Sequence, residues 1–95
     1  MNSRIQAAGG IVIKDDKILF IKKNGRWDLP KGKMEQGVNK KNTAIIEISE
    51  ETGLPENQLS ILKKLIPTHH QKQIEGKIIQ KKTFFLIHNM NTQKN

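Results

Sequence analysis

The segment from Asn39 to Leu54, NKKNTAIIEISEETGL, constrains the fold of this chain more than any other stretch. Asn39 is a favoured helix N-cap and Gly53 a favoured residue after a last helical turn, so we expect a helix over about 39–52. At about 100° per residue, one side of that helix is acidic and a separate side is mostly apolar. The acidic side holds Glu47, Glu50 and Glu51, and the other holds Ala44, Ile45, Ile48 and Thr52. One face therefore suits a core, and the other is either a solvated acidic surface or a place where a bound cation offsets the repulsion among the carboxylates.

The residues before and within this helix resemble the signature of the Nudix hydrolases, Gly-x5-Glu-x7-Arg-Glu-(aliphatic)-x-Glu-Glu-x-Gly-(aliphatic). The matching positions are Gly32, Glu47, Ile48, Glu50, Glu51, Gly53 and Leu54. The approach to the motif is also similar to that family, with Trp27-x-Leu29-Pro30-Lys31-Gly32-Lys33 followed by Glu35-x-Gly37. Two positions depart, because Val38 stands where the pattern has its first glutamate and Ile46 where it has arginine.

The resemblance implies an α+β fold in which a mixed β-sheet carries the helix of about 39–52 on one face. The length predicts a single domain over residues 1–95. Members of the family usually continue with a further strand and a C-terminal helix over the other sheet face, and this sequence ends before such a helix. We therefore expect a bare apolar sheet face that is either buried in a homodimer or accompanied by low stability.

The same resemblance implies a chemistry, the hydrolysis of a diphosphate linkage in a nucleoside-diphosphate derivative with Mg2+ or Mn2+. It assigns the metal to Glu47, Glu50, Glu51 and the backbone carbonyl of Lys31, and it makes Glu47 the acceptor of a proton from the attacking water. Candidate substrate contacts are Arg26, Lys31, Gly32 and Lys33. The last three lie in the segment Lys31 to Gly37, whose two lysines and two glycines suit a loop close to phosphates. The alternative for the three basic side chains is simple solvation.

The two departures predict weakened catalysis. In the family the arginine orients the neighbouring carboxylate, which Ile46 cannot do, and Val38 removes a carboxylate from the site. Losses of this kind cost about 10- to 100-fold in metal affinity or activity. The alternative function is a catalytically impaired Nudix-fold protein that binds a nucleotide or a partner.

Composition excludes other classes of protein. The chain has no cysteine, so disulfides, thiolate metal sites and a cysteine nucleophile are impossible. No stretch approaches the roughly 20 apolar residues of a membrane span and the N-terminus does not read as a signal peptide, so we expect a cytoplasmic protein without a membrane partner. The net charge of +8, from 17 basic and 9 acidic residues, favours polyanions. Nucleic acid is the less favoured partner, because arginines and aromatic residues are scarce.

Runs of β-branched and aliphatic residues predict the strands. We expect a hairpin of residues 7–13 and 17–22 around Asp15-Asp16, a turn at Asn24-Gly25, strands at 59–67 and 78–87 joined by a loop at 73–77, and a frayed tail over 88–95.

Three further features of these segments leave alternatives open. Gly9 and Gly10 indicate a bulge, a kink or a close approach of a ligand to the backbone. Trp27 is expected to pack against the sheet, with base stacking as the alternative. His69 and His70 are adjacent and so do not form a chelating pair, although either of them could contact a substrate phosphate.

Overall fold

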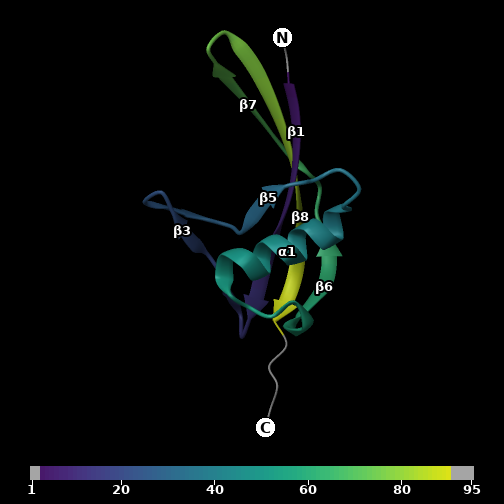
Figure 1. The fold of residues 1–95 in the computed structure, drawn as a ribbon. Coiled ribbons are helices and arrows are strands. Elements are labelled where there is room, and N and C mark those ends of the chain that lie inside the picture. Colours follow the sequence, from purple (N-terminus) through teal and green to yellow (C-terminus); the bar gives the residue numbers. More distant parts are fainter. Residues whose placement is uncertain (1–2, 91–95) are drawn as a thin grey trace.

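The structure is a computed structural model that describes residues 3–90, which form a curled mixed β-sheet, a separate two-stranded hairpin and one α-helix (Figure 1). The strands are β1 (Ser3–Lys14), β2 (Lys17–Ile18), β3 (Ile21–Lys23), β4 (Arg26–Asp28), β5 (Lys31–Lys33), β6 (Leu59–Lys64), β7 (Thr68–Ile74) and β8 (Lys77–Met90). The helices are α1 (Lys40–Thr52) and the short 3-10 helix η1 (Glu56–Gln58). The expected mixed sheet with one α-helix is confirmed.

The centre of the sheet is the pair of long strands β1 and β8, which run parallel from Ser3 opposite Ile79 to Ile13 opposite Asn89. The other pairings among residues 3–90 are antiparallel, with β2 and β5 beside β1 and with β6 and β7 beside β8. Because β8 is long, it pairs with β7 along its first half and with β6 along its second. In Figure 1 the β7 end of the sheet projects away from α1, which lies across β1 and β8.

Helix α1 begins and ends as the sequence predicts. The Asn39 side chain accepts a 2.8 Å hydrogen bond from the Asn42 N–H, and Gly53 adopts φ 79° beyond the last turn. The apolar side packs on the sheet in two adjoining clusters. Ala44 joins Ala8 and Leu86, and Ile48 joins Val12 and Leu59. Ile48 is completely buried, which stabilises the fold by roughly 1.5–3 kcal/mol.

The adjacent glycines of β1 allow close packing by the protein's own atoms. The pairing of β1 with β8 is continuous through Gly9 and Gly10, so a bulge, one of the three alternatives for these glycines, is excluded. A Cβ on Gly10 would lie 2.7 Å from Nδ1 of His88 and would collide with Ile48. A Cβ on Gly9 would collide with the Pro30 carbonyl oxygen. The glycines therefore let the helix and strand β5 approach β1.

The segment after the first hairpin differs from its prediction. Strand β2 ends at Ile18 instead of continuing to residue 22, because the chain leaves β1 and forms the separate hairpin β3–β4. Asn24 and Gly25 both have positive φ, 51° and 76°, as a tight two-residue hairpin turn requires. The expected packing of Trp27 against the sheet is also wrong. Trp27 is 70% exposed on this hairpin, and its ring centroid lies 5.6 Å from Nζ of Lys22.

The second half of the chain contains a strand that the sequence did not predict. The expected strand over 59–67 ends at Lys64, and β7 follows as a partner of β8 across a turn at Glu75 and Gly76. All residues of β7 are exposed, including His69 and His70, so no alternation of apolar and polar residues marks it.

The prediction of a frayed tail over 88–95 is wrong for residues 88–90, because β8 continues to Met90. His88 lies completely buried beside Gly10, which ties this end of β8 to the core. Residues 91–95 lie outside the part of the chain that the structure describes.

The sheet face opposite α1 carries Ile11, Phe85 and Ile87, all of them half-buried. Between residues 3 and 90 no second α-helix covers this face. The homodimer remains a prediction. Among the described residues, no helix is long and apolar enough to cross a membrane.

Candidate active site

Glu47 lies where α1 meets strand β5. A Cβ placed on Gly32 would collide with the Glu47 carboxylate, so this carboxylate rests directly against the Gly32 backbone. Gly32 is paired with Ala8 of β1, which fixes β5 to the sheet. Glycine is needed here for the close approach and not for an unusual φ. The packing of the helix on the sheet thereby holds Glu47 beside Gly32. Gly32 directly follows Lys31, whose backbone carbonyl is a predicted metal ligand.

The acidic side of α1 has too little positive charge around it. Burial raises the pKa of Glu47, and the charges of Glu50 and Glu51 raise it further. Lys23 lowers this pKa and Glu35 adds to its rise. The charged form of Glu47 is thus disfavoured unless a cation is added. Carboxylate oxygens are the ligands that Mg2+ and Mn2+ prefer, so the donor set fits such a cation.

Glu47 and Glu50 share a cavity of about 190 Å³ between α1 and the segment 33–38. Its lining residues are Lys33, Glu35, Val38, Thr43, Ile46, Glu47 and Glu50. Both departures from the family pattern, Val38 and Ile46, therefore lie at the same cavity as two of the predicted metal ligands. Thr43 is buried, and no residue between 3 and 90 gives its hydroxyl a hydrogen-bond partner.

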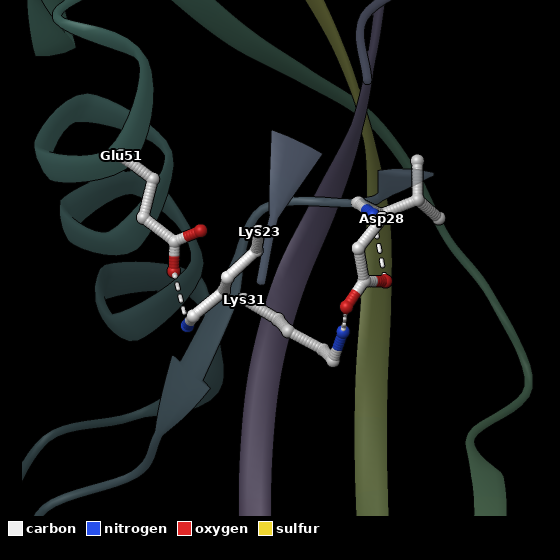
Figure 2. A network of polar contacts seen from close by, with 5 residues as sticks. Lys23, Asp28, Lys31 and Glu51 are labelled. Atoms are coloured by element: carbon white, nitrogen blue, oxygen red, sulfur yellow. Dashed lines mark hydrogen bonds and ion pairs between the residues drawn. The ribbon is translucent and has the colours of Figure 1, made fainter. Parts of the chain in front are cut away.

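The third glutamate lies apart from this cavity and faces Lys23. The Glu51 carboxylate is 3.9 Å from Nζ of Lys23, which reaches toward α1 from the end of β3 (Figure 2). Over residues 3–90, no three histidine or acidic side chains are arranged as a ready metal-binding group. The structure thus brings Glu47 and Glu50 together and turns Glu51 toward a lysine.

The predicted basic contacts lie in different surroundings. The Lys31 ammonium is paired with the Asp28 carboxylate (Figure 2). Burial opposes the charge on Asp28, but hydrogen bonds from Lys31 and the Leu29 N–H lower its pKa overall. Arg26 is exposed on the β3–β4 hairpin, opposite Lys23. Lys33 lines the acidic cavity.

Sequence reasoning missed Lys23 and Thr43. Lys23 carries no signal in the sequence, because the hairpin that delivers it to α1 is a tertiary feature. Thr43 could have been found, since Thr43, Glu47 and Glu50 have the spacing of one helix face.

The fold and site together define an α+β protein with a mixed sheet and an acidic helix held against a glycine-bearing strand. The NUDIX domain model matches residues 3–92. The chain therefore belongs to the NUDIX domain family.

Solved structures agree with this assignment of the fold. The Ap4A hydrolase of C. elegans superposes with a TM-score of 0.71 at 23% identity, over 96% of this chain and 71% of that one. The MutT protein of methicillin-resistant Staphylococcus aureus 252, described as a Nudix hydrolase, gives 0.64 at 27% identity, over 99% and 72%. RenU, a Nudix hydrolase from M. smegmatis, gives 0.70 at 19% identity, over 92% and 61%. No curated protein shows a significant match to the sequence.

Proposed function

We propose that this protein is a metal-dependent Nudix hydrolase that cleaves a diphosphate linkage in a nucleoside-diphosphate derivative. The observation that carries the proposal is the Glu47 carboxylate, held against Gly32 and beside Glu50 with a raised pKa. A structural neighbour named as an Ap4A hydrolase supports a dinucleoside polyphosphate as the first substrate to test.

Glu47, Glu50 and Glu51, with the backbone carbonyl of Lys31, are the residues that would hold Mg2+ or Mn2+. The bound cation would neutralise phosphate oxygens and lower the pKa of a water molecule. The raised pKa of Glu47 supports this role, since burial and the neighbouring carboxylates outweigh the opposing effect of Lys23.

The chain's own residues would then move the proton and orient the substrate. Glu47, with its raised pKa, is suited to accept a proton from the attacking water. Lys33 at the cavity and Arg26 on the nearby hairpin would contact phosphates, and Gly32 would keep the backbone accessible beside them. The backbone carbonyl of Lys31 would help to hold the cation. Its ammonium, which is paired with Asp28, would contact a phosphate where it leaves that carboxylate.

The test is hydrolysis of diadenosine polyphosphates and nucleoside-diphosphate sugars with Mg2+ or Mn2+. We expect metal-dependent turnover in the wild type and a large loss in Glu47→Gln. Glu56→Gln is the matched control, because Glu56 is exposed in η1 and does not line the cavity. The absence of any turnover that depends on Glu47 would refute the proposal.

A second candidate, nucleotide or partner binding without catalysis, is favoured by the two aliphatic side chains at the cavity. Val38 and Ile46 present hydrocarbon where the family pattern has a carboxylate and a guanidinium. This candidate predicts nucleotide binding that needs no metal and survives Glu47→Gln. Strict metal dependence of binding would count against it.

A further inference from the structure

Two residues from each of the strands β1, β8 and β7 form a polar patch at the end of the sheet that projects away from α1 (Figure 1). In each of its two rows, a residue of β1 is paired with one of β8, which is paired in turn with one of β7. Alternate residues of a strand face the same side, so the patch faces the side on which Ala8 packs against Ala44 of α1. The rows of this basic patch are Arg4, Gln80 and Gln71, and then Gln6, Lys82 and His69.

The basic patch lines a cavity of about 580 Å³ that has no carboxylate on its wall within residues 3–90. Its charged lining residues are Arg4, Lys81 and Lys82. The ion pairs of the described part of the chain involve Lys23 and Lys31 instead. The three cations therefore have no carboxylate partner there, and the glutamines of the patch add amide N–H donors. An anion is the ligand whose charge matches this cavity.

A further lysine adds positive charge at the edge of the patch nearest α1. The Lys82 ammonium lies 5.0 Å from the centroid of the Phe84 ring, and the ammonium of Lys40, the first residue of α1, lies 4.7 Å from the same centroid. Both lysines are half-buried. Two like charges held at one ring repel each other, and an anion bound by both would offset that repulsion. This crowding is a sign, independent of the cavity, that the patch takes an anion.

The basic patch adjoins the acidic cavity beside α1 through a third hollow. This hollow has a volume of about 500 Å³ and shares Arg4 and Gln6 with the patch. It shares Lys33, Glu35 and Val38 with the acidic cavity. A ligand that begins at the acidic cavity therefore has an open course to the patch.

The spacing along β1 indicates which part of a substrate reaches the patch. Glu47 rests against Gly32, which is paired with Ala8. Gln6 and Arg4 precede Ala8 on the same face of β1, which places the two rows about 7 and 13 Å along the strand from the level of Glu47. An anionic group bound there must belong to a part of the substrate beyond the scissile diphosphate.

We propose that the basic patch and Lys40 bind phosphate groups of the substrate that lie beyond the scissile diphosphate. The substrate class is then a nucleotide with a chain of three or more phosphates, rather than a nucleoside-diphosphate sugar. This inference rests on the proposed function and names its substrate class and specificity-determining residues. Arg4 and Lys82 would donate charge-assisted hydrogen bonds to phosphate oxygens.

The first experiment is titration with inorganic tripolyphosphate by isothermal titration calorimetry, without divalent cations, so that the acidic cavity does not contribute. Lys82→Gln should weaken binding about 10-fold, because it removes hydrogen bonds from a charged donor. The matched control is Lys77→Gln, which changes an exposed lysine of the same strand outside the cavity and should bind as the wild type does.

A gain of charge tests the patch from the other direction, because Lys82 is half-buried and its loss could disturb the fold, which circular dichroism checks. Gln80 is exposed and lies in the middle of its row. Gln80→Lys should therefore tighten tripolyphosphate binding several-fold. Gln73→Lys, at an exposed position of β7 outside the cavity, should leave the affinity unchanged.

The second experiment compares the hydrolysis of diadenosine tetraphosphate with that of a nucleoside-diphosphate sugar in the presence of Mg2+. Lys82→Gln should raise KM for the tetraphosphate about 10-fold and leave its kcat near the wild-type value, because the lost contact binds substrate and transition state alike. KM for the sugar nucleotide should not change.

The outcomes separate this inference from the function beneath it. Unchanged tripolyphosphate affinity in Lys82→Gln and Gln80→Lys would overturn the inference and leave the hydrolase proposal standing. An equal loss in Lys82→Gln and Lys77→Gln would show a general charge effect and would also overturn it. Tripolyphosphate binding that depends on Lys82, without hydrolysis of any nucleotide, would support the anion site and overturn the hydrolase proposal. Tighter, Lys82-dependent binding of an RNA oligonucleotide with a 5′-hydroxyl end would make the patch a nucleic-acid site and overturn the inference.

Discussion

Replacing Gly32 with alanine should separate the site from the fold. The new Cβ would collide with the Glu47 carboxylate, the movable end of a flexible side chain. Rotation of that side chain into a poorer geometry costs about 0.5–1.5 kcal/mol. Alanine restrains the unfolded chain, which offsets about 0.4–1 kcal/mol of this. The net change in the free energy of unfolding is therefore within about 1 kcal/mol.

Gly9→Ala is the matched comparison on the neighbouring strand. Its Cβ would collide with the Pro30 carbonyl oxygen and would lie 2.9 Å from the Lys31 Cα, atoms of the backbone that cannot rotate away. Overpacking of this kind costs about 1–3 kcal/mol. At about 4–8 °C per kcal/mol for a domain of this size, Gly9→Ala should lower the melting temperature by about 4–24 °C.

The assay pairs thermal unfolding followed by circular dichroism with Mn2+ titration. Gly32→Ala should melt within about 8 °C of the wild type but bind Mn2+ at least about 10-fold more weakly, because ligand positions tolerate only small displacements. Gly9→Ala should show the larger thermal loss. Two results would refute the reasoning. One is Gly32→Ala unfolding as severely as Gly9→Ala, and the other is Gly32→Ala keeping full Mn2+ affinity.

Three other predictions follow from burial and charge. Burial lowers the pKa of His88 below its usual 6.5. The unfolded chain therefore binds more protons than the folded chain just below pH 6.5, and stability should fall as the pH drops from 7 toward 5. Urea unfolding should show this fall, and His88→Leu should remove it. The pKa of Glu47 is raised, so its contribution to the free energy of unfolding is favourable at low pH and is lost as the pH rises above about 4.5. Glu47→Gln should therefore be more stable than the wild type at pH 7, whereas the stability of Glu56→Gln should be unchanged. The apolar face with Ile11, Phe85 and Ile87 predicts a homodimer by sedimentation equilibrium, and a monomer with no excess binding of hydrophobic dye would exclude it.

The sequence predicted correctly those features of α1 that depend on residues close together in the chain. The caps of α1 depend on a few neighbouring residues, so Asn39 and Gly53 marked its ends correctly. The glutamates were placed on one side of α1 by helical geometry alone, and the structure brings Glu47 and Glu50 to one cavity. Helical geometry alone does not show that the Glu51 carboxylate faces Lys23, because that lysine comes from the separate β3–β4 hairpin.

Features that depend on distant contacts were missed or mistaken. Strand β7 is polar and exposed throughout, and only its pairing with β8 makes it a strand. His88 was assigned to a frayed tail because its neighbours in sequence are polar, whereas its burial comes from Gly10 on β1. Trp27 was expected to pack against the sheet, but the hairpin that carries it leaves the sheet and exposes the indole.

The parallel pairing of β1 with β8 also governs when the protein can fold. Ala7 and Thr83 are paired although they lie 76 positions apart (83 − 7). Such distant pairing closes slowly, because the chain must first lose the entropy of the long intervening segment. During synthesis, α1 and its glutamates leave the ribosome well before β8 does. The sheet that supports the acidic helix is therefore completed only after β8, which follows α1 in the chain, has been made.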